Sequence, residues 1–395
     1  MRRLVGIVAA MCVAAGAATA QDARKVLETY KGNFDKGSLD VKIQILQAAA
    51  ADPAAKELGP LYLQSMEFVL ANVPLVQTDI RFRQLAGIAA GQVARIGYAP
   101  ARTALWLLYE ADTETGTRIS AANALGAVGA GDPEVIEHLN RFLETQNALF
   151  AAGKGSDRQV VPVLLRALGR LGDPSSFPSI FTAMALGYSA ETTQAAKDSL
   201  FAVKGDFREL LAGVVKAGRP AEKLQALQMG VESERITDAD EAALAELALD
   251  VGLHTSAPDV PSRALLREMR VLAARSLHDR SSPRTSQLLV EHLESTIAEA
   301  DRGLADAGAL IEAVSALGAV GTGEAAVRLT QYLARINAGT EKGKGYDEQV
   351  TGTVIENLGR LADKVAFDEL MFTQYLNYSN AIKTAARAAI ARLRW

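Results

Sequence analysis

The chain has little of what many enzymes and disulfide-stabilised folds depend on. Its only cysteine is Cys12, aromatic residues make up 6% of the 395 positions, and there are four histidines. After the first twenty residues no run of about 18 apolar residues occurs, so we expect no membrane-spanning helix in that part of the chain. A formal net charge of -4 gives no general attraction for nucleic acid or anionic lipid. Alanine is instead the commonest residue, a composition that favours helices.

The first twenty residues have the pattern of an export signal. Arg2 and Arg3 give a positive start, residues 4–15 are apolar, and small residues precede a cleavage point after Ala20. We therefore expect a signal peptide over 1–20 and a periplasmic or secreted mature protein. Cleavage of the signal peptide would remove Cys12, the only cysteine, which excludes disulfides and thiolate metal sites from the mature protein. It also takes the formal charge from -4 to -6.

Helices are predicted throughout the mature chain. Apolar residues recur at helical spacing between short breaks, and no segment shows sustained period-two alternation. Three dipeptides place a side-chain acceptor at an expected N-cap and proline at the first helical position: Asp132-Pro133, Asp173-Pro174 and Ser282-Pro283. We expect more than about two thirds of the mature residues to be helical, against about one third in an average globular protein, with no sheet.

One short segment recurs along the chain. Residues 124–129 are repeated identically at 316–321, and related segments stand at 167–172 and 357–362. Neighbouring copies lie 43 and 41 residues apart, which is the length of one helical hairpin with its connections. The small residues in these copies let two helices approach closely.

The stretch 118–133, which contains the first copy, resembles the HEAT repeat, including the HEAT-like variety of phycobilisome lyases. The resemblance implies an all-α fold, a right-handed superhelical solenoid of antiparallel helix pairs of the HEAT/armadillo kind. In such a stack each helix pair buries its apolar face only against its neighbours.

A longer duplication organises the chain. Residues 153–203 align without gaps with 343–393 at an offset of 190, and 17 of the 51 positions are identical. We expect one continuous solenoid in five parts: the signal peptide (1–20), an N-terminal helical cap (21–82), a first HEAT-like block (83–203), helical connecting repeats (204–266) and a second HEAT-like block (267–395).

No familiar catalytic motif stands in the sequence. No two histidines share a helix face at metal-binding spacing, and the nucleophile elbow, the Walker loop and the dinucleotide fingerprint are all missing. The pairs Glu137-His138 and Glu291-His292 are typical of a helix surface. The sequence therefore predicts a protein that is not an enzyme and that has no cofactor and no metal.

The duplicated loops are the first candidates for a binding site. Each copy joins two helix pairs and holds a lysine between two glycines, with an aspartate three residues after the lysine: Lys154 and Asp157, then Lys344 and Asp347. A lysine so placed can grip an acidic group. Alternatively, the glycines serve turn geometry and the aspartates cap the helices that follow. Should the loops bind nothing, the helical faces around Tyr188 and Tyr378 are the next candidates.

Three functions remain open. The leading hypothesis is a non-catalytic exported scaffold that binds a protein partner in the cell envelope through an extended face, with no nucleic-acid partner and no membrane span. The second follows the family resemblance: a HEAT-like lyase or isomerase that holds a ligand in its groove. The third is a small-molecule or glycan-binding module.

Overall fold

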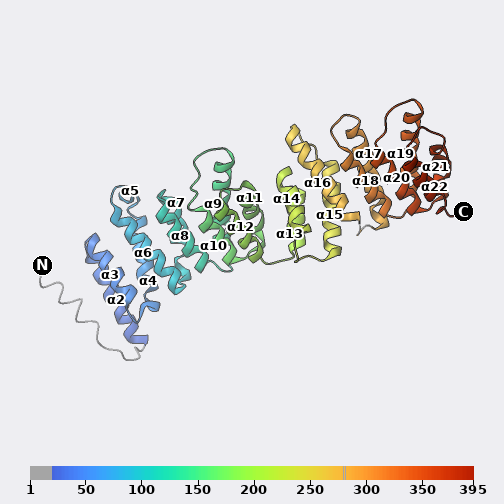
Figure 1. Cartoon of the computed structure of the whole chain (residues 1–395). Helices are drawn as coiled ribbons and strands as arrows, with labels where there is room; N and C mark the ends of the chain where they lie inside the picture. The colour runs from blue at the N-terminus through green and yellow to red at the C-terminus, as the bar shows by residue number, and fades with distance from the viewer. Residues whose placement is uncertain (1–19, 279, 281) are drawn as a thin grey trace. The chain divides into compact units, whose positions relative to one another are not determined.

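The computed structural model describes residues 20–278, 280 and 282–395, which divide into two compact units. Unit 1 ends at Lys204 and unit 2 comprises Gly205–Trp395 (Figure 1). The signal peptide predicted over 1–20 lies, but for Ala20, outside the described residues.

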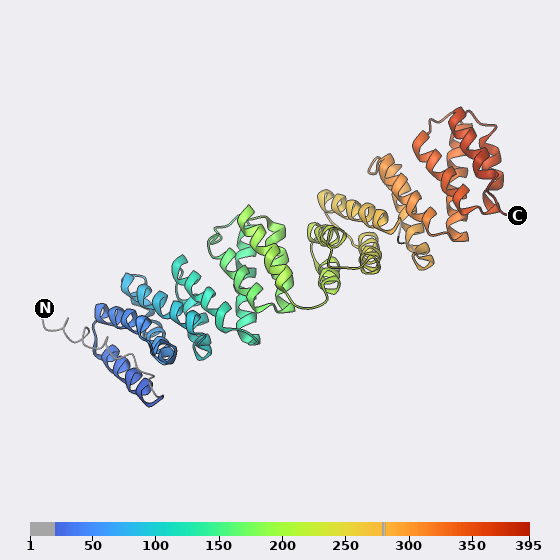
Figure 2. The same ribbon diagram turned by 60° about the horizontal axis from the view of Figure 1, so that its bottom comes forward.

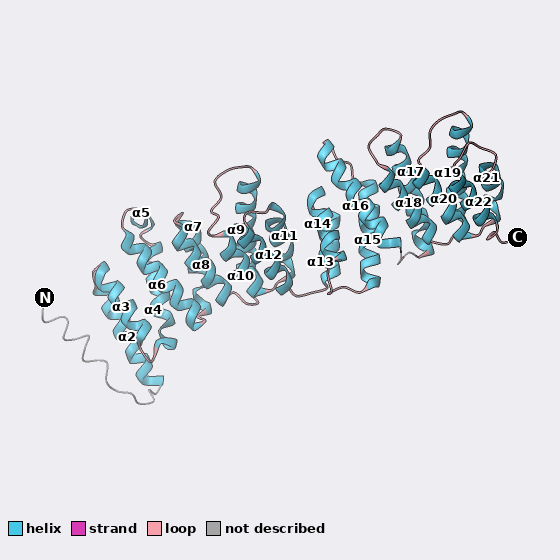
Figure 3. Ribbon diagram, viewed as in Figure 1, coloured by secondary structure: helices cyan, strands magenta, loops and turns pink. Residues whose placement is uncertain are grey.

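The described part of the chain is helical and contains no strand (Figure 3). The helical share is 78%, which confirms the expectation of more than two thirds. Of the three expected N-caps, Asp132 accepts hydrogen bonds from the backbone N–H groups of Glu134 and Val135. Asp173 caps a short 3-10 turn, whereas Ser282 makes no capping bond.

Unit 1 begins with a group of N-terminal helices and continues as helix pairs. The elements are α2 (Ala20–Lys36), α3 (Leu39–Ala51), η1 (Ala55–Leu58), α4 (Gly59–Leu70), α5 (Val73–Val76), α6 (Ile80–Ile96), η2 (Ala99–Ala101), α7 (Arg102–Ala111), α8 (Thr115–Val128), α9 (Pro133–Ala151), α10 (Val161–Leu171), η3 (Pro174–Ser176), α11 (Phe177–Leu186) and α12 (Ala190–Ala202). The pairs are α7–α8, α9–α10 and α11–α12.

Unit 2 continues the same pattern. Its elements are α13 (Phe207–Ala217), α14 (Pro220–Val231), α15 (Asp238–His254), α16 (Val260–His278), η4 (Pro283–Thr285), α17 (Ser286–Ala300), α18 (Ala307–Ala319), α19 (Gly323–Glu341), α20 (Glu348–Leu361), η5 (Lys364–Ala366), α21 (Phe367–Thr373) and α22 (Asn380–Ile390). The pairs run from α13–α14 to α21–α22.

Within each unit the pairs stack side by side, as Figures 1 and 2 both show. We call the first helix of a pair the A helix and the second the B helix. A helices contact the next A helix, and B helices contact the next B helix. This arrangement confirms the all-α solenoid of antiparallel helix pairs predicted from the repeated segments.

The repeated leucine-glycine motif lies where successive B helices meet. Leu125 and Leu168 are fully buried. A Cβ atom on Gly126 of α8 would lie 2.7 Å from the Cα of Ala167 in α10. The backbones approach so closely that only a hydrogen atom fits at this position, which explains why the motif recurs with glycine.

The second copy of the motif repeats this packing in unit 2. Leu317 and Leu358 are fully buried. A Cβ on Gly359 of α20 would stand 3.0 Å from the Cα of Ala389 in α22.

The duplication is preserved in backbone geometry as well. Gly172, which ends α10, has φ 64° and its carbonyl accepts a hydrogen bond from the N–H of Lys204 at 2.9 Å. At the same offset, Ala362 ends α20 with φ 55° and accepts from the N–H of Arg394, also at 2.9 Å. Ala362 thus keeps a left-handed conformation that usually selects glycine, together with the hydrogen bond that its glycine counterpart makes.

A cluster of polar groups is buried in unit 2. The Arg270 side chain on α16 is 5% exposed, and its Nη2 donates to both carboxylate oxygens of Glu299 at 2.7 and 2.6 Å. His292 on α17, a residue that sequence alone favoured as surface, is only 1% exposed. Burial and, as the smaller cause, the nearby positive charge of Arg270 together lower the pKa of this imidazole to about 3.

The close approach of B helices predicts opposite effects of alanine at two helical glycines. Gly126→Ala should lower the free energy of unfolding by about 1–3 kcal/mol, because the new methyl group collides with α10 backbone. Gly91→Ala, in the middle of α6 with no atom within 4 Å of the added Cβ, should raise it by about 0.5–1 kcal/mol through helix propensity. Urea unfolding followed by circular dichroism measures both, and equal effects of the same sign would contradict the packing.

Burial of His292 predicts a pH dependence of stability. Between pH 6.5 and about 3 the unfolded state binds a proton that the folded state does not, so stability falls as the pH falls. From pH 7 to pH 4 the parent should lose about 3 kcal/mol more than the His292→Leu variant, which has nothing to protonate there. Urea unfolding of both proteins across this range measures the difference. Parallel pH profiles would show that the imidazole titrates freely in the folded protein.

Candidate functional site

The first glycine-lysine-glycine loop follows α9 in unit 1. Gly153 has φ 65°, and the N–H of Lys154 donates to the carbonyl of Leu149 at 2.9 Å. This bond closes the end of α9, and the Lys154 side chain is exposed. Among the described residues Lys154 forms no ion pair.

Asp157 has a structural part in the same loop. Its backbone N–H donates to Gln146 Oε1 at 2.7 Å, and its Oδ2 accepts from Thr115 Oγ1 at 2.7 Å. Its Oδ1 accepts from the N–H groups of Gln159 and Val160 at 3.3 and 3.4 Å, in the turn that leads into α10. The carboxylate is thus occupied by the fold on both oxygens.

The second loop has the same course in unit 2. Gly343 has φ 76°, and the N–H of Lys344 donates to the carbonyl of Gly339 at 2.9 Å. The Lys344 side chain is exposed. Asp347 is the N-cap of α20 and accepts from the N–H of Val350 at 2.9 Å. In both copies the lysine side chain is exposed and forms no ion pair with another described residue, while the aspartate supports the next helix.

The two candidate tyrosines lie inside the units. Tyr188 and Tyr378 are each 6% exposed, and their hydroxyl groups donate to the Oδ1 atoms of Asn147 and Asn337 at 3.0 and 2.9 Å. Burial raises the pKa of both phenols, which keeps them protonated as donors. These side chains therefore fasten one helix pair to the next and offer little surface to a partner.

The asparagines were not singled out from sequence. Their Nδ2 groups donate to the backbone carbonyls of Ser179 and Glu369, at 3.0 and 3.1 Å. Asn147 and Asn337 are 190 positions apart, as are the two carbonyl residues and the two tyrosines. Extending the 190-residue alignment a few positions upstream would have identified them.

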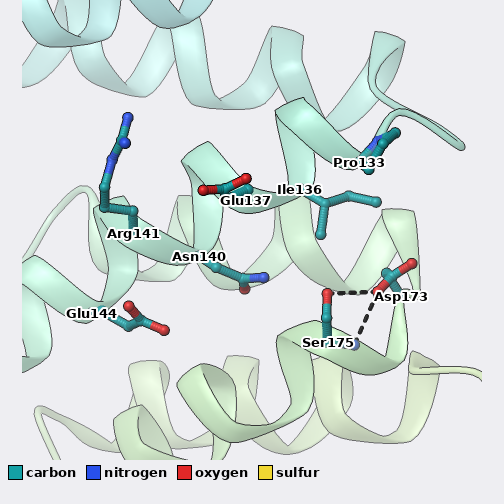
Figure 4. A pocket seen from close by; sticks show the side chains of 8 residues that line it. All are labelled: Pro133, Ile136, Glu137, Asn140, Arg141, Glu144, Asp173 and Ser175. Atoms are coloured by element: carbon teal, nitrogen blue, oxygen red, sulfur yellow. Dashed lines mark hydrogen bonds between the residues drawn. The ribbon is translucent and has the colours of Figure 1, made fainter.

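A groove lies in unit 1 between α9 and the start of the next A helix (Figure 4). Its volume is about 460 Å³, and α9 lines it with Glu137, Asn140, Arg141 and Glu144. Arg141 forms a 3.0 Å ion pair with Glu110 of α7. Among the described residues neither Glu137 nor Glu144 forms an ion pair.

The opposite wall of this groove is η3. Asp173 accepts hydrogen bonds from the N–H and the hydroxyl of Ser175, at 2.9 and 2.6 Å. Asp173 adds a third carboxylate to the lining, so that acidic groups outnumber the single arginine.

A second groove lies between the A helices α15 and α17 of unit 2. Its volume is about 540 Å³, and its acidic lining residues are Glu246, Asp250 and Glu291. The Nδ1 of His254 lies 3.1 Å from Asp250, and its Nε2 lies 3.7 Å from Glu291. Arg284 is the one arginine in the lining. Both grooves therefore combine three carboxylates with one arginine at a junction between A helices.

The described residues contain no group of three or more His, Cys, Asp or Glu side chains that could hold a metal ion. None of their helices is long and apolar enough to cross a membrane.

Residues 117–145, most of α8 and the first part of α9, match the family model of the PBS lyase HEAT-like repeat. The chain contains a HEAT-like repeat where the sequence predicted one. No curated protein matches the chain.

Three solved structures are similar to the chain at low identity. An engineered protein is 17% identical with a TM-score of 0.37, and the match covers 95% of this chain and 92% of that one. A chain from the structure of a phosphorylation switch that controls the interaction between cadherin and beta-catenin is 13% identical with a TM-score of 0.37, over 95% and 76% of the two chains. Importin 13 in its cytosolic state is 13% identical with a TM-score of 0.34, over 98% of this chain and 52% of that one.

The tyrosine-asparagine bond predicts a difference between two hydroxyl deletions. Tyr188→Phe should lower the free energy of unfolding by about 1–3 kcal/mol, because it leaves the buried Asn147 Oδ1 without its donor. Tyr375→Phe removes a hydroxyl from a side chain that is 77% exposed and should change stability by less than about 0.5 kcal/mol. Denaturant unfolding compares the two, and equal losses would contradict a packing role for Tyr188.

Proposed function

We propose that this protein is a non-catalytic scaffold that binds a protein partner through the acidic grooves between its A helices. The observation that supports the proposal most is the pair of grooves, one in each unit, each with three carboxylates and one arginine. Solenoids present their helix faces as extended binding surfaces.

The charge of the grooves selects the chemistry of the partner. Glu137, Glu144 and Glu246 lack an ion-pair partner among the described residues, so a cationic side chain would gain an interaction without breaking one. We therefore propose a partner segment that carries lysine or arginine at positions spaced to reach successive carboxylates. Exposed charges of this kind act mainly on association rate and specificity.

The exposed lysines of the two loops supply a second kind of contact. Lys154 and Lys344 stand on loops whose backbone bonds are already satisfied within the fold. Each lysine can therefore bind an acidic group without rearrangement. A partner with basic residues for the grooves and acidic residues for the loops would be held at a defined position along a unit.

The site of action that we propose is the cell envelope. The proposal rests on the residue pattern of 1–20, which predicts export and cleavage after Ala20. Fractionation of source cells, with the N-terminus of the recovered protein sequenced, tests this part separately from binding.

The lyase or isomerase alternative draws its support from the repeat match at 117–145. That segment supplies helix-packing residues such as Leu125, and Glu137 and Arg141 from the groove. We favour binding over catalysis because Glu137 and Arg141 are exposed, whereas acid-base groups gain their catalytic strength from a shielded position.

Charge reversal in the first groove tests the scaffold. Glu137→Lys together with Glu144→Lys should weaken binding of a fluorescent lysine-rich peptide and reduce capture of the envelope partner by the full-length protein. The control is Glu191→Lys, an exposed glutamate on α12 outside the groove, which should leave both nearly unchanged. Binding of the peptide should weaken as salt rises, because exposed charges are screened within about 8 Å at physiological ionic strength.

The second arm of this experiment concerns the loops. Lys154→Glu with Lys344→Glu should reduce capture of the partner while the lysine-rich peptide still binds. If the groove variant and the Glu191→Lys control behave alike at low and high salt, the grooves are not the binding surface. If the loop variant captures like the parent, the loops are connectors only.

A further inference from the structure

The last helix pair of unit 2, α21 and α22, carries a surplus of positive charge (Figure 1). Residues 370–395 contain no aspartate or glutamate and four cationic side chains: Lys383, Arg387, Arg392 and Arg394. The lysine is half-buried and the three arginines are exposed. Arg387 donates from its Nε to Gln374 Oε1 at 3.0 Å, and within the described part of the chain none of the four forms an ion pair. These cations are therefore available to an anionic partner.

The acidic residues just before this stretch reduce its charge without cancelling it. Asp363 accepts a hydrogen bond from a backbone N–H, and Glu369 accepts one from Asn337 Nδ2, both at 2.9 Å. Asp368 is exposed. Over the whole pair, residues 363–395 hold five cationic and three acidic side chains, so the surplus remains.

The duplicated pair in unit 1 lacks this surplus. There α11 and α12 occupy the equivalent place, and residues 173–205 hold two cationic and three acidic side chains. Two exposed acids of α12, Glu191 and Asp198, correspond to the exposed alanines Ala381 and Ala388 of α22. Because unit 1 forms the same helix pair with these acids, their absence from α22 is not a requirement of the fold. The surplus charge is therefore a property of the surface.

Exposed aromatic rings accompany the charge. Trp395 is 82% exposed, Tyr375 is 77% exposed and Phe372 is 37% exposed. Their counterparts in unit 1 are a glycine, an alanine and a threonine. Of the two copies, only the second combines surplus cations with exposed rings.

The rings lie at both ends of α21. The Trp395 ring contacts that of Phe367, the first residue of the helix, with centroids 5.1 Å apart. Tyr375 stands two residues past the last residue of the helix, and its neighbour Gln374 holds Arg387. The rings and cations are thus spread along the helix pair, which suits a broad surface better than a small ligand.

The surface of an anionic lipid bilayer has the chemistry that matches this face. Lysine and arginine are attracted by the negative potential of its headgroups. Tyrosine and tryptophan are favoured at the boundary between headgroups and acyl chains, because their rings are apolar and carry a polar group. An acidic protein segment would use the cations but gives no reason for water-exposed rings at both ends of a helix.

We propose that the α21–α22 pair binds the surface of anionic lipid bilayers, with its four cations facing the headgroups and with Tyr375 and Trp395 entering the interfacial layer. The contact is peripheral, and no helix crosses the bilayer. The net charge of -4 does not oppose it, because exposed charges farther away than about 8 Å are largely screened at physiological ionic strength. The site goes beyond the scaffold function, since it uses a different surface from the groove between α15 and α17.

The test is sedimentation of the full chain with vesicles. The probe is vesicles made of equal parts of phosphatidylglycerol and phosphatidylcholine, and vesicles of phosphatidylcholine alone are the control. The protein should bind the mixed vesicles at least several-fold more tightly than the neutral ones, and added salt should weaken this binding because it screens the charges. Tryptophan emission should shift to shorter wavelength as Trp395 leaves water, and Trp395→Phe should lose that shift.

Variants of the same chain locate the contact, since any contribution of residues 1–19 is common to all of them. Ala381→Glu with Ala388→Asp introduces the acids that unit 1 has, and should weaken binding to the mixed vesicles at least several-fold while the helical signal stays unchanged. Lys197→Glu makes the same change of net charge at an exposed position of α12 and should leave binding nearly unchanged. Tyr375→Ala, which introduces the residue found at the equivalent place in unit 1, should also weaken binding and is available should the double variant fail to fold.

The outcomes are distinct. Weaker binding by the α22 double variant and by Tyr375→Ala, but not by Lys197→Glu, supports the site. Equal binding by the parent and all of these variants overturns it, and so does equal binding to mixed and neutral vesicles. A glutamate-rich peptide that binds this face when the vesicles do not would also overturn it and assign the face to an acidic protein segment. The lysine-rich peptide should bind the α22 double variant as it binds the parent, so this site and the proposed function stand or fall separately.

Discussion

The contact on which the rest of the structure depends is the approach of one B helix to the next at the leucine-glycine motif. Gly126 meets α10 and Gly169 meets α12 at distances that exclude a side chain. Close packing of this kind draws the B helices together along one side of each unit. Successive A helices pack less closely than successive B helices. The acidic grooves lie at the junctions between A helices and are lined by glutamate, aspartate and arginine. The packing motif and the proposed binding surface therefore belong to opposite helices of the same repeat.

The duplication shows which contacts this packing requires. The pairs Tyr188 with Asn147 and Tyr378 with Asn337 occupy equivalent places, although only a third of the neighbouring residues are identical. Each asparagine joins an A helix to the backbone of the following pair, and each tyrosine holds that asparagine in place. A hydrogen bond retained on buried side chains is costly to lose, since a single substitution leaves its partner unsatisfied. We infer that these pairs set the register between neighbouring helix pairs in both copies.

Much of the fold could be predicted because its determinants are local. Helical spacing, the Asp132 cap and the repeated glycines act over a few residues, so the sequence reveals them directly. The buried cations could not be predicted in this way. Lys223, for example, is buried because its ammonium donates to the carbonyls of Val215 and Lys216 at the end of α13, a contact that depends on where the next helix turns back. His292 was likewise expected on a surface, because its place beside a glutamate on a helix does not reveal that its side chain is buried.

The candidate sites also divide into those formed by one local segment and those formed by several stacked helices. Lys154 and Lys344 could be found from sequence, since a loop keeps its residues together, and both side chains are exposed as a contact residue must be. The two grooves could not be found, because each draws residues from elements that only stacking brings together: Glu137 with Asp173 in the first, and Asp250 with Glu291 in the second. In a solenoid, therefore, repeats identify the architecture while binding chemistry arises between repeats. It follows that non-repeated residues at repeat junctions are the best places to look for what distinguishes one such protein from another.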